Sequence, residues 1–195
     1  MTVIGITGPT GAGKTTVLQY LQENGAVILD CDRIYYELLA TNVALRNELT
    51  ETFGDVFFPD GSLDRGKLGK LVFEDEKKLR ELNAIIYYYM GLEVRKRLKE
   101  TKAEGKSLAA IDAINLIDSG LGELCSITVA VTAPKKLRLA RIMARDGIDE
   151  AYALSRISAQ QDDEYFVRRC QAVLYNDGTE QELIQKATTL FKEIL

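Results

Sequence analysis

The stretch of residues 8–15 constrains this chain more than any other part of the sequence. It reads Gly-Pro-Thr-Gly-Ala-Gly-Lys-Thr and fits the phosphate-binding pattern G-x-x-x-x-G-K-[ST] at every fixed position. An apolar run at residues 3–6 precedes it, and a helical pattern of Val17, Leu18 and Leu21 follows it. A strand, a glycine-rich turn and a helix in this order predict a site for a nucleoside triphosphate. The alternative is a glycine-rich turn that joins strand and helix without a ligand.

Each residue type in this loop has a chemical reason. The glycines let the backbone turn tightly, so that successive N–H groups point at a phosphate with no Cβ in the way. The following helix adds the positive end of its dipole. Lys14 supplies a cation for the β and γ oxygens, and the Thr15 hydroxyl is placed to coordinate Mg²⁺. We expect nucleotide contacts from Gly8, Thr10, Gly11, Ala12, Gly13, Lys14, Thr15 and Thr16.

Composition excludes several classes of chemistry. The 195 residues include no histidine, so a Ser-His-Asp triad, a Cys-His pair and a histidine-ligated metal are ruled out, and a carboxylate is the expected general base. A net charge of −4 gives no electrostatic case for a nucleic-acid surface. Three widely spaced cysteines argue against a disulfide framework or a zinc site and favour a reducing compartment. With no targeting or long apolar segment in view, we expect a cytoplasmic protein without a membrane partner.

The alternation of strand and helix patterns predicts the fold class. Short apolar runs indicate strands, and they alternate with helical patterns, which implies a parallel sheet covered on both faces. We therefore predict an α/β fold of three layers with a five-stranded parallel sheet. The region from residue 33 to 104 is almost entirely helical and is predicted to be an insertion. The predicted strands are residues 3–6, 26–30, 108–113, 127–131 and 172–175, and the predicted helices are 34–41, 43–50, 64–73, 75–104, 134–145, 150–160 and 179–194.

Carboxylates stand where two predicted strands end. Ligands of such sheets bind beyond the carboxyl ends of the strands. Asp30 and Asp32 are two apart on a predicted extended chain, so we expect both to point toward the site. One of them could orient an acceptor hydroxyl and take its proton, and the alternative for Asp32 is a cap on the next helix. Asp112 ends the third predicted strand, where a carboxylate near Mg²⁺ is expected.

Arginines recur on the predicted helix of residues 134–145. Arg141 and Arg145 are four apart and share a face, and Arg138 lies three residues before Arg141. In kinases, arginines on a mobile segment close over the transferring phosphate and stabilise its charge. A surface face of ion pairs is the alternative for this helix.

The ordered set of motifs resembles the bacterial dephospho-CoA kinases over nearly the whole chain. The phosphate loop alone marks only a superfamily, whereas the succession of motifs is much more selective. The matching segments are LDCDRI at 29–34, FG at 53–54, GSLDR at 61–65, VF at 72–73, LN at 82–83, RIMARDG at 141–147 and NDG at 176–178.

This resemblance implies one P-loop kinase domain over residues 1–195. Its core would be residues 1–32 and 106–195, with a helical substrate-binding insertion at about 33–105 and a lid at about 138–165. It implies ATP with Mg²⁺ as donor and the ribose 3′-hydroxyl of dephospho-CoA as acceptor, in the last step of coenzyme A synthesis. The implied catalytic residues are Asp32 as base, Lys14 and the lid residue Arg141. Arg145 and Asn176 would contact the nucleotide, and Thr15 and Asp112 the metal.

The chain departs from the family pattern near the expected acceptor. The family's His-Pro is Tyr87-Tyr88 here, and its D-A-P-L-L-F-E segment is residues 112–118, which keep acids at Asp112 and Asp118 but lose the proline. The glutamine before the lid arginine is Arg138. Asp32, Asp112, Tyr87 and Asp118 are the expected acceptor contacts.

Two other functions remain open at this point. The first is a kinase for another small hydroxyl compound, such as a nucleoside or sugar. The second is a nucleotide-dependent regulator without phosphotransfer, against which the absence of an N-K-x-D guanine-reading motif speaks. The expected partners are small molecules and no nucleic acid, and the expected state is a monomer or weak homo-oligomer.

Overall fold

The computed structural model describes residues 1–192 and Ile194, and it divides into two compact units. The first unit, called the sheet unit here, comprises Met1–Leu29 and Glu100–Leu195. The second, called the helical unit, comprises Asp30–Lys99.

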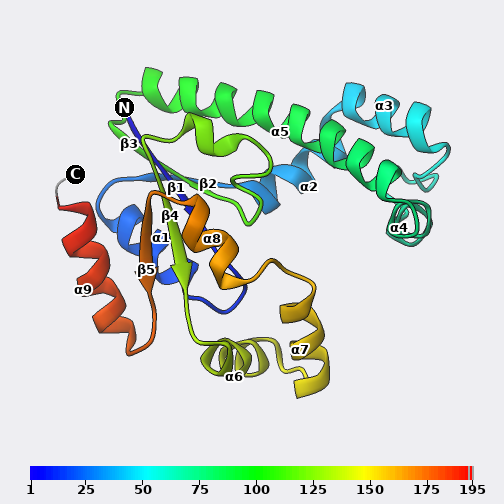
Figure 1. Cartoon of the computed structure of the whole chain (residues 1–195). Helices are drawn as coiled ribbons and strands as arrows, with labels where there is room; N and C mark the ends of the chain where they lie inside the picture. Colours follow the sequence, from blue (N-terminus) through cyan, green and yellow to red (C-terminus); the bar gives the residue numbers. More distant parts are fainter. Residues whose placement is uncertain (193, 195) are drawn as a thin grey trace. The chain divides into compact units, whose positions relative to one another are not determined.

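A parallel sheet forms the centre of the sheet unit, and Figure 1 shows its strands running through the middle of that unit. The strand order is β2-β3-β1-β4-β5, with β1 central and parallel to both β3 and β4. In β1, every residue after Thr2 is buried, as expected for a strand covered on both faces. This confirms the predicted five-stranded α/β fold. The strands are β1 (Thr2–Thr7), β2 (Val27–Asp30), β3 (Leu108–Asp112), β4 (Ile127–Thr132) and β5 (Ala172–Tyr175).

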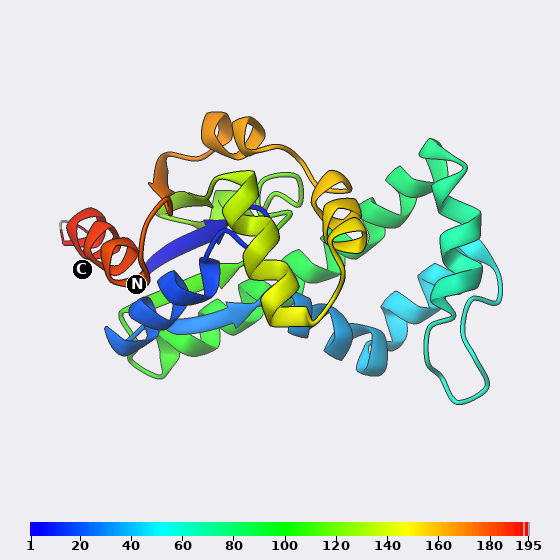
Figure 2. The same cartoon turned by 90° about the horizontal axis from the view of Figure 1, so that it is seen from below.

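Helices cover both faces of this sheet. Helices α1 and α9 pack against each other, and Val17, Leu21 and Phe191 join the buried core of the strands. Figure 2 shows α1 and α8 on opposite sides of the sheet. The sheet unit also contains the last turn of α5. Its other helices are α1 (Lys14–Glu23), α6 (Lys135–Asp146), α7 (Glu150–Ser158), α8 (Asp163–Arg169) and α9 (Glu180–Phe191), with a 3₁₀ turn at Leu121–Leu124.

Local sequence signals mark the ends of two helices. The Thr179 hydroxyl and the Glu182 carboxylate form a capping box that starts α9. Gly147 ends α6 with a φ of 64°, a left-handed conformation that glycine adopts without strain. The sequence missed α8 and the 3₁₀ turn. The predicted end of the last helix is at 194, whereas α9 ends at Phe191 and Ile194 lies in a turn.

The helical unit is built from four helices without a sheet of its own among its described residues. Ile34, Leu45, Leu68 and Val94, one from each helix, are all buried. An isolated bridge between Phe57 and Leu63 closes the loop between the second and third of these helices. The helices are α2 (Cys31–Thr41), α3 (Val43–Phe53), α4 (Arg65–Phe73) and α5 (Glu76–Ala103), of which α5 continues into the sheet unit.

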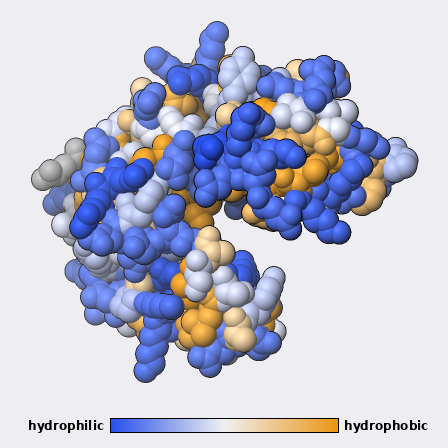
Figure 3. Space-filling view, turned by 45° about the vertical axis from the view of Figure 1, so that its right-hand side comes forward, coloured by the Kyte–Doolittle hydropathy of each residue, from blue (hydrophilic) through white to orange (hydrophobic). Residues whose placement is uncertain are grey.

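The surface in Figure 3 is mostly hydrophilic, and apolar side chains gather in a few separate areas. Among the described residues, no helix has the length and apolar character needed to cross a membrane.

Candidate functional site

The phosphate loop leaves β1 through glycines that no other residue could replace without movement. Gly8 has a φ of 135°, and a Cβ placed on it would lie 2.1 Å from the Val131 carbonyl oxygen of β4. Gly13 has a φ of 103°, and its Cβ would lie 2.3 Å from Nδ2 of Asn176. The absence of side chains at these positions lets neighbouring strands and loops press against the turn.

The N-terminus of α1 faces the loop without an acidic cap. Helix α1 starts at Lys14, its cap residue is Gly13, and its first turn contains no acidic residue. The unbonded N–H groups of a first turn are a favourable place for an anion. The Lys14 ammonium donates to the carbonyl oxygens of Gly8 at 2.7 Å and Pro9 at 3.3 Å, so its charge lies over the loop. This geometry suits a phosphate group.

Two side chains from elsewhere in the sheet unit bind the loop backbone. Asn176, which is only 5% exposed, donates from Nδ2 to the Ala12 carbonyl at 2.8 Å. Arg141 donates to Oδ1 of Asn176 at 3.2 Å and to the Gly11 carbonyl at 3.4 Å. The loop after β5 and helix α6 are thereby brought together at the phosphate loop.

The side chain of Arg145 binds Asp146, whereas that of Arg141 binds the phosphate loop. The Arg145 guanidinium makes two hydrogen bonds to the neighbouring Asp146 carboxylate, at 2.7 and 2.9 Å, and Arg156 adds a third at 2.5 Å. The bonds from Arg145 and then Arg156 lower the pKa of Asp146 to about 2. Arg138 does not join Arg141 either, because it is buried and paired with Asp163. Of the three arginines, only Arg141 contacts the phosphate loop through its side chain in this structure.

Helices α6 and α7 share a small core of their own, separate from the core of the sheet. Ile142, Ala153 and Ile157 are buried in it, and the half-buried Leu139, Met143 and Ile148 pack around them. Helices α6 and α7, which make up most of the predicted lid, are thus packed as one hairpin.

Of the two predicted acids at and after the end of β3, Asp118 lines a polar cavity. Asp112 ends β3 opposite Ile6 of β1, and Asp118 accepts a hydrogen bond from the Tyr165 hydroxyl and lies 3.7 Å from Arg169. Burial, together with the bond to Asp118, raises the pKa of Tyr165 to about 12. The cavity has a volume of about 390 Å³ and is lined by Ile114, Asn115, Asp118, Ala159, Gln160, Gln161, Tyr165 and Phe166.

The residues predicted to hold Mg²⁺ have suitable chemistry. Mg²⁺ in nucleotide sites takes one or two protein oxygens and completes its shell with phosphates and water. Thr15 presents an exposed hydroxyl in the first turn of α1, and Asp112 a half-buried carboxylate at the strand end. No cluster of three metal-binding side chains occurs within residues 1–192 and 194.

In the helical unit, the expected arrangement of Asp30 and Asp32 is wrong. Helix α2 begins at Cys31, so Asp32 lies in its first turn and not on an extended chain. Asp30, the last residue of β2, is the cap and accepts a hydrogen bond from the Arg33 amide at 3.0 Å. The helix starts early because the Asp30 carboxylate satisfies that amide, and Asp32 is left exposed.

The three tyrosines of α5 have different surroundings. Tyr87 is half-buried, Tyr88 is 60% exposed, and the Tyr89 hydroxyl donates to Glu48 at 2.8 Å. The bond to Glu48 is the main reason that the pKa of Tyr89 is raised. The tyrosine run therefore presents one ring to solvent and ties one hydroxyl to α3.

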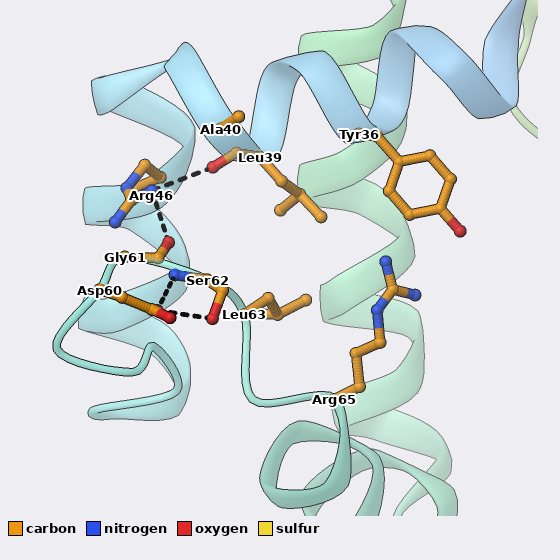
Figure 4. Close-up of a pocket in the computed structure, with 9 residues that line it drawn as sticks. All are labelled: Tyr36, Leu39, Ala40, Arg46, Asp60, Gly61, Ser62, Leu63 and Arg65. Carbon is orange, nitrogen blue, oxygen red and sulfur yellow. Dashed lines mark hydrogen bonds between the residues drawn. The ribbon is translucent and has the colours of Figure 1, made fainter.

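A pocket of about 410 Å³ lies wholly within the helical unit. Figure 4 shows the residues that line it. Arg65 stands with its guanidinium 5.0 Å from the centre of the Tyr36 ring. Arg46 closes the other end, donating to the carbonyls of Leu39 at 3.1 Å and Gly61 at 2.8 Å. Sequence reasoning missed this pocket, although the GSLDR motif contains four of its residues. The lining residues are Tyr36, Leu39, Ala40, Arg46, Asp60, Gly61, Ser62, Leu63 and Arg65.

Comparison with known families and proteins agrees with this architecture. The family model described as dephospho-CoA kinase matches residues 2–182. A dephospho-CoA kinase of Streptomyces avermitilis is 37% identical over 196 residues, covering 100% of this chain and 95% of the relative. A second, from Carboxydothermus hydrogenoformans, is 34% identical over 192 residues, covering 98% of this chain and 93% of the relative.

Solved structures show the same fold. The structure of TT1252 from Thermus thermophilus has a TM-score of 0.80 and 29% identity, covering 100% of this chain and 98% of its own. Dephospho-CoA kinase from Campylobacter jejuni has a TM-score of 0.67 at 21% identity, over 98% of this chain and 96% of its own. A shikimate kinase from Acinetobacter baumannii, at a TM-score of 0.51 and 19% identity, covers 100% of this chain and 94% of its own. The last two likenesses concern the fold alone.

Proposed function

The chain belongs to the dephospho-CoA kinase family, and we propose that it transfers the γ-phosphate of ATP to the ribose 3′-hydroxyl of dephospho-CoA. In this step a bond forms between the 3′-oxygen and the γ-phosphorus, and the bond from that phosphorus to the β,γ-bridging oxygen breaks. The products are coenzyme A and ADP. The observation that carries the proposal is the phosphate loop, with Lys14 and Arg141 bonded across it in a chain related to these kinases over its full length.

The donor side of the proposal rests on the sheet unit. Phosphoryl transfer depends mainly on positioning and on stabilising the charge of the transferring group. The loop amides and Lys14 would bind the β- and γ-phosphates, and Arg141 would follow the γ-phosphate through transfer. Mg²⁺, held by Thr15 and near Asp112, would neutralise charge on the phosphate oxygens. Arg145 would contact the nucleotide only after its hydrogen bonds to Asp146 break.

The acceptor side needs a base and a binding surface. We assign the base to Asp32, whose exposed carboxylate would accept the 3′-hydroxyl proton as the new bond forms. Asp112, Asp118 and Tyr87 are the other proposed acceptor contacts. Asp118 lines the polar cavity after β3, and Tyr87 lies half-buried on α5.

The pocket in Figure 4 suits an anionic part of the acceptor. Among the described residues, no carboxylate lies within ion-pair distance of Arg65, and the guanidinium rests on the Tyr36 ring. An arginine that is oriented but not neutralised can bind a phosphate oxygen. We therefore propose that Arg65 recognises the diphosphate of dephospho-CoA.

Cellular location and assembly belong to the same proposal. An odd number of widely spaced cysteines supports a cytoplasmic enzyme. We propose a monomer or weak homo-oligomer that acts on two small-molecule substrates.

An assay that couples ADP formation to dephospho-CoA tests this function. With Mg-ATP and dephospho-CoA, the purified protein should form ADP and coenzyme A in equal amounts. Without dephospho-CoA, ADP formation should be slow. A panel of nucleosides and sugars serves as the control. Faster turnover with one of those compounds would favour a changed acceptor. The reason to test for this is that the chain departs from the family pattern at Tyr87, Tyr88 and Arg138. Slow hydrolysis unaffected by any acceptor would favour a regulator.

A further inference from the structure

Arg138 is a buried charge at the edge of the phosphate loop. Its residue is 3% exposed, and one of its terminal nitrogens lies 2.5 Å from Oδ1 of Asp163. Its Nε is also buried and has no hydrogen-bond partner in the described part of the chain. Taking a guanidinium out of water is costly, and well-packed neutral residues often give equal or greater stability. Stability alone therefore gives a weak reason for an arginine here.

The backbone of Arg138 lies directly against the phosphate loop. A Cβ placed on Gly11 would come within 2.8 Å of the Arg138 carbonyl oxygen and 3.1 Å of its Cα. One turn further along α6, Arg141 donates to the Gly11 carbonyl. A shift of the start of α6 would therefore move or release the loop at Gly11.

The partner of Arg138 belongs to a segment that also holds the loop. Asp163 lies in the first turn of α8, immediately after the cap residue Asp162. Three residues before Asp163, the Gln160 side chain accepts a hydrogen bond from the Thr10 amide at 2.9 Å. The ion pair thus joins the two segments of chain that touch consecutive loop residues, Thr10 and Gly11.

We propose that the Arg138–Asp163 ion pair is a positioning contact for the phosphate loop. It ties the start of α6 to the start of α8, and so keeps the Arg138 backbone against Gly11 and Gln160 against Thr10. The loop amides then point at the triphosphate before it binds, which reduces the ordering that binding would otherwise require. This inference builds on the proposed function only in naming ATP as the ligand.

Nucleotide affinity, measured without acceptor, tests this role independently of the transfer reaction. The two disruptive variants are Arg138→Met, which removes the charge, and Asp163→Asn, which keeps the shape of the acid. Because the contact is a single nitrogen–oxygen pair, Arg138→Lys can restore it. Arg168→Met is the matched control, since Arg168 pairs with Glu164 on the exposed face of α8. The fifth variant is the double change Arg138→Met with Asp163→Asn.

We expect Arg138→Met and Asp163→Asn each to raise the Kd for Mg-ATP about tenfold, because the loop is less ordered before binding. Arg138→Lys should stay within about threefold of the parent, and Arg168→Met should leave the Kd unchanged. In turnover assays the KM for ATP should rise while the KM for dephospho-CoA stays constant. If a variant only lowered the fraction of folded protein, both KM values would instead stay at those of the parent.

The double variant separates positioning from stability. It buries no unpaired charge, so its unfolding temperature should recover toward that of the parent while its ATP affinity stays low. Recovery of affinity together with stability would overturn the proposal, and so would a Kd within twofold of the parent in both single variants. If the parent binds ATP but does not phosphorylate dephospho-CoA, the proposed function fails and this test still stands.

Discussion

The phosphate loop and the pocket of the helical unit hold their basic side chains in different ways. At the loop, Lys14 and Arg141 donate to backbone carbonyls of the loop itself. In the helical unit, Arg65 rests on the Tyr36 ring and has no carboxylate within ion-pair distance among the described residues. The first arrangement fixes the site through the backbone, whereas the second leaves a charge available to a ligand.

Because of this difference, the two sites should tolerate amino-acid substitutions to different degrees. A site made by backbone turns depends on glycines at Gly8 and Gly13, where any Cβ would meet another atom. A site made by side chains on helices can change its ligand through single substitutions. The departures from the family pattern at Tyr87, Tyr88 and the 112–118 segment lie outside the phosphate loop, which is complete. We infer that donor binding is the constrained half of the reaction.

The largest effect is expected from Asp32→Asn. Turnover should fall by ~10²–10⁴ while the affinity for ATP changes little, because a general base acts on the acceptor alone. Asp30→Asn is the matched control, since asparagine also caps a helix and should preserve α2. Steady-state kinetics and an ATP titration of both variants provide the check. Asp32→Asn turnover within a few-fold of the parent would remove Asp32 from the role of base.

Arg141→Ala should lower turnover by ~10²–10³, as the loss of one group that stabilises transition-state charge does in other enzymes. The substitution also removes the hydrogen bonds from Arg141 to Asn176 and Gly11, which should weaken ATP binding. Lys136→Ala, an exposed change on the same helix, should have no effect on either quantity. Equal kinetics for the two variants would show that Arg141 has no part in transfer.

Arg65→Ala is expected to raise the KM for dephospho-CoA about tenfold, as loss of a charge-assisted hydrogen bond would. The KM for ATP should not change, because the pocket in Figure 4 lies wholly in the helical unit. Lys70→Ala removes the same charge from an exposed position of α4 and should leave both constants unaltered. An unchanged KM for dephospho-CoA in Arg65→Ala would exclude this pocket as an acceptor site.

The smallest effect concerns acid stability of the hairpin of α6 and α7. The pKa of Asp146 is lowered to about 2, so the folded state binds this proton less readily than the unfolded state. Its contribution is therefore complete above the ordinary carboxyl pKa of ~3.9 and is lost as the pH falls toward 2. The unfolding temperatures of the parent and Asp146→Asn should converge over this range. A constant difference from pH 5 to pH 2 would contradict the role of the Arg145 and Arg156 bonds.

Much of the fold follows from local sequence signals. The phosphate-loop pattern and the five apolar runs identify the sheet because each is recognisable within a few residues. Helix α8 was missed because it is only seven residues long and buries a single side chain, Phe166. Its cap, Asp162, was a signal that could have found it.

The side-chain geometry of the site was less predictable. A charged helix such as α6 suggests an exposed arginine, and only a partner 25 residues away makes Arg138 a buried one. The sequence pattern predicts an extended chain at Asp32, because the strand and helix patterns do not show that the helix starts immediately after Asp30. Such features depend on tertiary contacts, which periodicity does not encode.

The measurement that most directly tests the division between the two substrates is calorimetric titration of each ligand into two variants. Lys14→Ala should lose affinity for Mg-ATP and keep its affinity for dephospho-CoA, and Arg65→Ala should show the reverse. If Arg65→Ala weakened ATP and left dephospho-CoA unchanged, or if Lys14→Ala bound ATP like the parent, the account of donor and acceptor sites would be contradicted.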